Sequence, residues 1–314
     1  MDMHGPRPTV SRLPGGTYAT SPDLLPGAVV STVGYASVDQ TPTLHRGLPS
    51  PYLTVIFSLD GPIVSGATAE EALGSTAARN HLLVAGLHTA PTYVVQPPSQ
   101  SGIQLAVHPL AARRLLGAPS ARVPWEATEG AELLGPQVAR VHQRLAELTS
   151  WQAQFDLLAG YLRERADRRA AEVRPELREA WSWLARRHGA GSMDDLARHV
   201  SFSPRQLRAV FRAELGSGPK QVARLMRFDA AKRSLAAAVV RDARPSSPSA
   251  TERPLGLTEI AVRCGYYDHS HLDAEFRSLA GVSPTGWVAE EHRNIQVGGH
   301  RSEPEWAHDI AELP

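Results

Sequence analysis

The sequence predicts an α+β protein. A sheet-rich amino-terminal region, a small barrel or sheet with following helices, precedes an all-α region of two helix-turn-helix units joined by a linker helix. Three observations predict this order. Short runs rich in β-branched residues fill residues 28–109, apolar residues then recur every three or four positions, and two stretches after residue 190 are similar to each other. A chain of 314 residues is long enough for two hydrophobic cores.

Composition narrows the class of protein. Hydrophobic residues make up 42% of the chain and charged residues 21%, as in globular rather than disordered proteins. Cys264 is the one cysteine, so no internal disulfide can form, and a reducing compartment is expected. No run reaches the ~18 apolar residues of a membrane-spanning helix, and the amino end lacks the apolar core of a signal peptide. We therefore expect a cytoplasmic protein with no membrane partner.

The amino-terminal half is expected to be a flexible arm over residues 1–26 and a folded region over residues 27–172. The arm is rich in Pro and Gly and has no periodicity. Alternating and β-branched runs predict strands at 28–38, 52–59, 63–68, 81–87, 92–97 and 103–109. Amphipathic spacing predicts helices within 109–117, 131–150, 151–169 and 174–189.

Helix-start and helix-stop residues punctuate the region from 174 to 294. Ser192 and Ser203 can each begin a helix through a capping box, and Gly216 can end one in the left-handed conformation. A linker helix is expected at 219–238 and an irregular, Pro- and Ser-rich loop at 241–256. Further helices are expected at 258–264, at 269–280 and briefly after Pro284, followed by a flexible acidic tail at 295–314.

An internal repeat defines the two helix-turn-helix units at 192–216 and 258–281. When Phe211-Arg212 is aligned with Phe276-Arg277, Leu207 falls on Leu272 and Gly216 on Gly281. Each copy reads as a short helix, a tight turn and a second helix. Gly265 makes the turn in the second copy, whereas Ser201 stands there in the first. The residues expected between the paired helices are Leu196, Ala197, Val200, Leu207, Val210 and Phe211, then Ile260, Ala261, Cys264, Leu272, Phe276 and Leu279.

The exposed face of the first unit's second helix carries Arg205, Arg208 and Arg212, at spacings that place them on one side. Gln206 lies beside them. In the major groove of DNA, Arg can hold guanine and Gln can hold adenine, although three arginines on an isolated helix are more often a solvated face. The second unit offers His269, Ser270 and Arg277, but Asp273 would oppose phosphates. We therefore expect the first unit to supply most of the affinity for double-stranded DNA.

The segment from about 177 to 294 resembles the AraC/XylS family of bacterial transcription regulators. The resemblance is carried by LARHVSFSPRQLRAVFRAELGSGP and by LTEIAVRCGYYDHSHLDAEFRSLAGVSPTGW. It implies two recognition helices in successive major grooves, a contact with RNA polymerase, and no catalytic residue or cofactor. Two departures concern the second unit. The loop at 241–256 is an insertion, and Asp273-Ala274 stand where the family has a basic residue.

Residues 28–173 are similar, more weakly, to the cupin-like sensor domains that precede such units. That similarity implies a small-molecule effector in the barrel and pairing into a homodimer through helices at 131–168. The histidines lie on separate elements and lack the His-x-His pair of metal-binding cupins, so no metal site is expected; they are His45, His81, His88 and His108. Two alternatives stay open: a cupin-type enzyme with a DNA-binding appendage, and a DNA-binding protein that needs no ligand.

Overall fold

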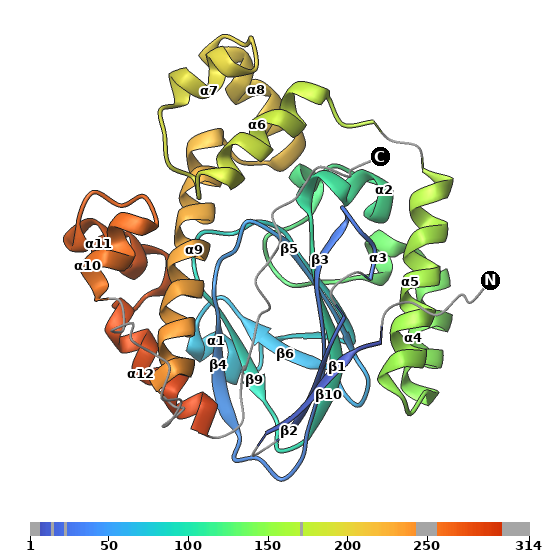
Figure 1. The fold of residues 1–314 in the computed structure, drawn as a ribbon. Coiled ribbons are helices and arrows are strands. Elements are labelled where there is room, and N and C mark those ends of the chain that lie inside the picture. Colours follow the sequence, from blue (N-terminus) through green and yellow to red (C-terminus); the bar gives the residue numbers. More distant parts are fainter. Residues whose placement is uncertain (1–6, 14–15, 22–23, 170–171, 243–255, 297–314) are drawn as a thin grey trace.

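Two antiparallel sheets form the amino-terminal part of the chain (Figure 1). The structure is a computed structural model and describes residues 7–13, 16–21, 24–169, 172–242 and 256–296. The larger sheet has the strand order β1-β2-β3-β10-β5-β8-β11, and the smaller sheet has the order β4-β9-β6-β7. In chain order the strands are β1 Thr9–Leu13, β2 Gly16–Thr20, β3 Val29–Ser37, β4 Thr43–Gly47, β5 Leu53–Ser58, β6 Ile63–Gly66, β7 Ala78–Asn80, β8 Leu82–Ala85, β9 Thr92–Gln96, β10 Gln100–Val107 and β11 Thr128–Glu129.

The flexible arm predicted for residues 1–26 is wrong for two of its segments. Strands β1 and β2 pair with each other, with Thr9 opposite Thr20, and β2 pairs with β3, with Tyr18 opposite Tyr35. Short strands between Pro and Gly residues carry little periodic signal of their own, and pairing with the long strand β3 decides their conformation. The strands β4, β7 and β11, which pair with β9, β6 and β8, and the five-residue helix α1, Ala69–Leu73, were not predicted either, because each is too short to show a periodic pattern.

Helices α4, Gln137–Glu147, and α5, Trp151–Arg168, cover one face of the larger sheet (Figure 1). On that face Phe57 and Ile103 are fully buried against Phe155 and Leu158. A Cβ atom at Gly34 would lie 2.5 Å from the indole of Trp151, so the helix approaches bare backbone there. The shorter helical segments are η1 Pro109–Ala111, α2 Ala112–Leu116, η2 Ser120–Arg122 and α3 Ala131–Leu134.

The carboxy-terminal part is helical, so the predicted α+β fold is confirmed. Its helices are α6 Pro175–Arg186, α7 Met193–His199, α8 Pro204–Leu215, α9 Pro219–Asp242, α10 Leu257–Arg263, α11 His269–Ala280 and α12 Pro284–Gln296. The side chain of Ser192 caps α7, and Ser203 forms the expected capping box with Gln206 at the start of α8. Gly216 and Gly281 end their helices with φ of 73° and 74°.

Two helices are longer than predicted. The linker helix α9 runs to Asp242 rather than to residue 238, so it includes the first two residues of the predicted loop; the sequence has no Gly or Pro between residues 220 and 242 to end the helix earlier. Helix α12 extends to Gln296 and so includes the first residues of the predicted tail. Its Trp287 is buried against Phe276, with ring centroids 5.8 Å apart. The rest of the predicted loop and tail, residues 243–255 and 297–314, lies outside the described residues.

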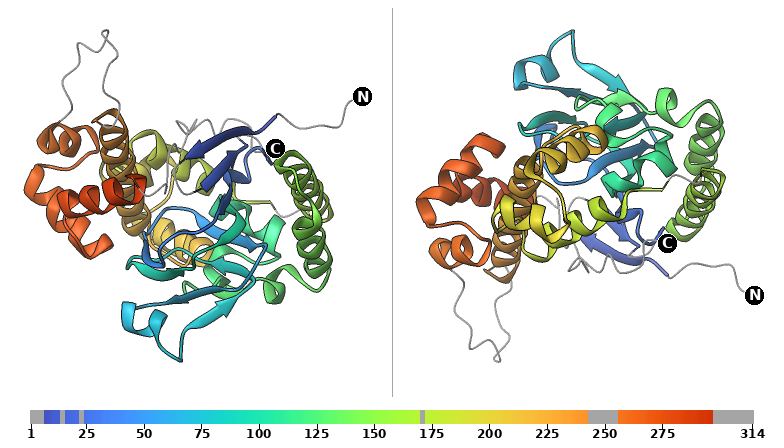
Figure 2. Two further views of the ribbon diagram at one scale, coloured as in Figure 1. Left: turned by 90° about the horizontal axis from the view of Figure 1, so that it is seen from below. Right: turned by 90° about the horizontal axis from the view of Figure 1, so that it is seen from above.

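The helical part packs on the sheets on the side opposite to α4 and α5 (Figures 1 and 2). His108, just after β10, packs against Trp181 of α6, with ring centroids 4.8 Å apart and ring planes tilted by 57°. Leu87 packs against the core of each of the two helix-turn-helix units as well as the core of the sheet region. Among the helices that the structure describes, none has the length and apolar character needed to cross a membrane.

Candidate nucleic-acid interface

The first helix-turn-helix unit consists of α7 and α8. Leu196, Ala197, Leu207 and Phe211 are almost completely buried between the two helices, as predicted, and Val210 is half-buried. The turn between them places Ser201 at φ 56° and is closed by a hydrogen bond from the Phe202 N–H to the carbonyl of Ala197, at 2.8 Å. Ser201 thus has the positive φ expected at this turn, although a serine lacks the conformational freedom of glycine.

The arginines predicted to read DNA lie on the exposed side of α8. Arg205, Arg208 and Arg212 are all exposed, whereas Leu207 and Phe211 of the same helix are buried. The Nε of Arg208 donates to the carbonyl of Pro204 at 3.1 Å, which holds the stem along the helix. This arrangement presents three positive charges to solvent from one helix, and their contact with DNA stays a prediction.

The opposite end of α8 is attached to the sheet region. Arg113 of α2 donates through its Nε to both carboxylate oxygens of Glu214, at 2.7 and 3.0 Å. A Cβ atom at Gly216 would lie 3.2 Å from the Cα of Ala121 in η2. Because only the carboxyl end is docked, the amino-terminal turns of α8 stay exposed, and those are the turns that enter the groove in helix-turn-helix proteins.

Gln206 has a local role that competes with base reading. Its Oε1 accepts hydrogen bonds from the N–H of Ser203 at 2.9 Å and from the Ser203 hydroxyl at 2.8 Å. A two-point contact with adenine needs the amide oxygen as well as the amide nitrogen. Gln206 would therefore have to leave the cap of α8 to read a base in that way.

The second unit consists of α10 and α11, with Gly265 at φ 82° in the turn. Its predicted interior is confirmed, since Ile260, Ala261, Leu272 and Phe276 are all buried. At the start of α11, His269 and Ser270 are exposed. Arg277 is exposed too, but its Nε is paired with the Asp273 carboxylate at 2.8 Å.

Two further exposed residues, which the sequence analysis did not single out, lie close to the two second helices along the chain. Tyr267 stands just before Asp268, the residue that caps α11, and 88% of its surface is exposed. Lys220 is exposed in the first turn of α9. An aromatic residue directly before a helix cap, and a lysine directly after the Pro that starts a helix, are the sequence signals that could have pointed to them.

Cys264 and the described histidines are residues that could act as a nucleophile or as metal ligands. Cys264 is buried, and burial raises the pKa of its thiol, so it stays protonated and packs as a small apolar residue. His88 contacts the carbonyl of Ala90 through its Nδ1, whereas the Nδ1 of His108 accepts from the Leu110 N–H. No group of three or more metal-ligating side chains converges within the described ranges.

Comparison with known proteins gives structural neighbours only. No family model and no curated protein matches the chain. An AraC-type transcriptional regulator from Chromobacterium violaceum is 24% identical over 40% of this chain and 96% of its own, with a TM-score of 0.31.

Two further solved structures are similar to the chain. ToxT from Vibrio cholerae is 8% identical over 82% of this chain and 97% of its own, with a TM-score of 0.47. The carboxy-terminal domain of the response regulator AraT from Geobacillus stearothermophilus is 19% identical over 43% of this chain and 98% of its own, with a TM-score of 0.32. The structural neighbours of this chain thus include AraC-type transcription regulators, the family that its sequence resembles.

Proposed function

We propose that this protein is a sequence-specific transcription regulator that binds duplex DNA with α8 and α11 in successive major grooves. The observation that carries the proposal is the exposed row of Arg205, Arg208 and Arg212 on the second helix of a duplicated helix-turn-helix unit. Arginine forks suit both guanine edges and phosphates. His269, Ser270 and Arg277 make fewer contacts from the second unit, because Asp273 partly neutralises that face.

The length of the linker helix supports reading of two grooves. Helix α9 has 24 residues, and at 1.5 Å per residue it spans about 36 Å, close to the ~34 Å of one turn of DNA. Tyr267 and Lys220 add contacts to the phosphate backbone. A cytoplasmic location and a contact with RNA polymerase are part of this proposal.

Selection of bound sites from random duplexes tests the proposal. We expect two half-sites one helical turn apart, and we expect Arg208→Ala to weaken binding to the selected site by about 1–3 kcal/mol. Arg163→Ala is the matched control, because Arg163 is also exposed but belongs to α5, which lies on the other side of the sheets from the helical part (Figure 1). Equal affinity of Arg208→Ala and the wild-type protein would contradict the assignment of α8 as a recognition helix.

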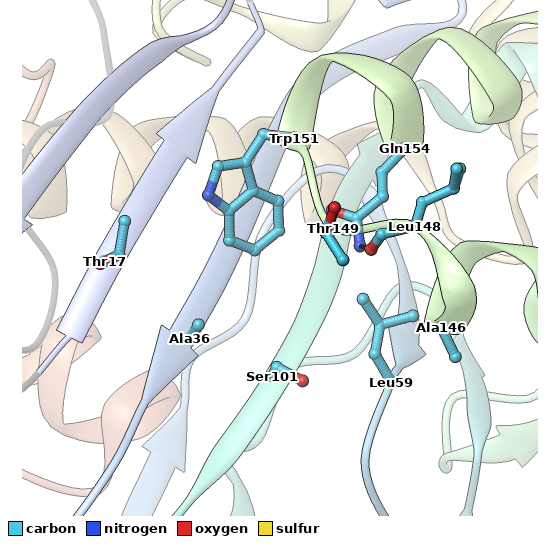
Figure 3. A pocket seen from close by; sticks show the side chains of 9 residues that line it. All are labelled: Thr17, Ala36, Leu59, Ser101, Ala146, Leu148, Thr149, Trp151 and Gln154. Atoms are coloured by element: carbon cyan, nitrogen blue, oxygen red, sulfur yellow. Dashed lines mark hydrogen bonds between the residues drawn. The ribbon is translucent and has the colours of Figure 1, made fainter.

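The finer part of the proposal is a small-molecule effector in the sheet region. A hollow of about 340 Å³ opens between the larger sheet and the turn that joins α4 to α5, and the Trp151 indole forms one wall (Figure 3). In this proposal the effector binds on the helix-covered face of the sheet, and not inside the barrel that the sequence analysis expected. Its lining has no ionisable side chain, which favours an uncharged aromatic molecule; it consists of Thr17, Ala36, Leu59, Ser101, Ala146, Leu148, Thr149, Trp151 and Gln154.

Thermal unfolding with uncharged aromatic probes such as indole and naphthol tests this site. A probe that binds only the folded state must raise the melting temperature. Ala36→Leu should fill the hollow and remove that rise. A rise of equal size in Ala36→Leu would show that the probe binds outside this hollow. No rise with any probe would leave a DNA-binding protein whose sheet region does not bind this class of effector. Homodimer formation through α4 and α5 would use polar outer faces, because Val138, Leu145 and Leu158 are buried in the core.

A further inference from the structure

Arg227, in the middle of α9, contacts the second helix-turn-helix unit and the turn that leads into the first. We propose that Arg227, acting through Glu275, fixes the orientation of the second unit relative to the first and so determines which spacing of half-sites the protein accepts. The inference rests on the proposed function, because a spacing is defined only for a protein that reads two grooves.

The contact with the second unit is a two-pronged ion pair. The Nε of Arg227 donates to Glu275 Oε1 at 3.3 Å, and its Nη2 donates to Glu275 Oε2 at 3.1 Å. The guanidinium also lies over the ring of Tyr266, 5.3 Å from its centroid, in the turn that precedes α11. A fork-shaped pair of this kind is directional, so it constrains rotation as well as distance.

Glu275 lies on the inner side of α11, away from the exposed His269 and Arg277. Its side chain is only 9% exposed, and a carboxylate at that depth is costly unless it is paired. Arg224, one turn before Arg227, supplies the second partner through its Nε at 3.2 Å. The Nη2 of Arg224 also donates to the Ser278 hydroxyl at 2.7 Å. Two arginines of α9 thus hold two positions of α11.

On the side of the first unit, Arg227 contacts the turn between α6 and α7, which leads directly into that unit. The Nη1 of Arg227 donates to the carbonyl of Gly189 at 3.4 Å. Gly189 has φ 73°, and a Cβ atom there would lie 1.9 Å from the carbonyl oxygen of Ala223. The backbone of this turn therefore rests directly on α9, one helical turn before Arg227.

The turn of the second unit also meets the turn between α6 and α7 beside Arg227. A Cβ atom at Gly265, in the turn of the second unit, would lie 2.9 Å from the Cβ of Ala190 and 3.7 Å from the Cδ of Arg227. Arg227 fills the junction at which the linker helix, the first unit and the second unit come together. Its loss should leave the core of each unit intact, because those cores are built from other residues.

The rigidity of this junction, called the joint below, determines which spacings of half-sites on DNA the protein can bind. Each added base pair rotates the second half-site by roughly 34° about the duplex axis and shifts it along that axis. A rigid joint fits one spacing and loses the second contact at the others, whereas a loosened joint fits several spacings less well.

The experiment compares affinities for the selected site with those for sites whose half-sites are moved 1 bp closer or further apart. We expect the wild-type protein to lose about tenfold in affinity on either change. Arg227→Gln and Glu275→Gln should bind the best site more weakly and should reduce that ratio to about threefold or less. Arg186→Gln is the control, because its exposed guanidinium pairs with Glu179 within one helix, and it should keep the wild-type ratio.

The outcomes separate this inference from the proposed function. A wild-type protein that binds no DNA, or binds all spacings equally, would overturn reading of two grooves and this inference with it. A wild-type ratio near tenfold that is unchanged in Arg227→Gln would overturn the inference alone. If Arg227→Gln does not fold, as judged by thermal unfolding, Arg227→Lys decides by the same ratio, because it keeps the charge and loses the fork.

Discussion

Arg208 and Gln206 lie two positions apart on α8, and the structure treats them differently. The side chain of Arg208 is exposed, and its Nε donates to the carbonyl of Pro204 along the helix. The short amide of Gln206 is part of the helix cap, where its Oε1 accepts two hydrogen bonds from Ser203. The sequence predicted both the arginine face and the capping box. The sequence could not show whether the Gln206 amide caps α8 or reads a base, because that choice depends on whether DNA is present.

Asp273 and Arg277 give a prediction at this scale. Asp273→Asn should strengthen binding to the selected DNA severalfold and should make the logarithmic dependence on salt steeper by about one unit. The change removes a carboxylate near phosphates and releases Arg277 from its ion pair. Titrations between 50 and 200 mM salt would measure both effects. Glu164→Gln, which breaks the comparable pair with Arg168 on α5, should alter neither, and an unchanged slope for Asp273→Asn would place α11 away from the DNA.

At the scale of elements, helices with strong end signals were predicted well and short strands poorly. The bounds of α8 and α11 agree with the prediction because a serine or aspartate cap and a left-handed glycine mark their ends. Strands β1, β2 and β4 carry no such marks, and their hydrogen-bond partners are distant in sequence or form only on folding. The two turns of the repeat show the same backbone bend from different residues, Ser201 and Gly265.

For these two turns we expect opposite effects on stability when glycine is introduced in the first and removed from the second. Ser201→Gly should stabilise the protein by roughly 0.5–1 kcal/mol, because relief of about 1–2 kcal/mol of left-handed strain exceeds the cost of glycine's freedom in the unfolded chain. Gly265→Ala should destabilise it by about 1–2 kcal/mol, since it adds that strain and a close contact with Ala190. Urea unfolding measures both. Gly160→Ala is the control: a Cβ atom there meets nothing within 4 Å, so this change inside α5 should stabilise the helix.

At the scale of the whole molecule, the helical units are attached to the sheet region at several points. Arg46 of β4 pairs with Glu290 of α12 at 3.1 Å, and Arg113 pairs with Glu214 of α8. Between these ion pairs the contact is apolar and aromatic, with His108 packed under Trp181. Residues separated by 70 or more positions meet there, so no local pattern in the sequence could indicate the contact.

His108 makes the stability of this contact depend on pH. Burial lowers the pKa of His108 from an ordinary 6.5 to about 3. Above pH 6.5 the imidazole is neutral in both the folded and the unfolded chain and has no effect. As pH falls from 6.5 toward 3, the unfolded chain takes up a proton that the folded chain refuses. The free energy of unfolding therefore drops by up to about 1.4 kcal/mol per pH unit.

Thermal unfolding between pH 7.5 and 5 measures this loss. Burial lowers the pKa of His88 and His188 as well, so part of the loss should persist in any single variant. His108→Asn keeps an acceptor for the Leu110 N–H but cannot take up a proton, and its melting temperature should fall less steeply with acid than that of the wild-type protein. Identical slopes would show that His108 is not the group that resists protonation.

The sequence by itself determined the order of sheet and helices, the duplicated unit, its buried residues and the arginine face, because each of these follows from spacing along one element or from a residue at its end. The tertiary structure decided the strands of the amino terminus, the ion pairs that dock α8 and α12, and the meeting of Arg227, Glu275 and Gly189. Those features join residues that are far apart in the chain. Their geometry exists only once the separate elements have packed together.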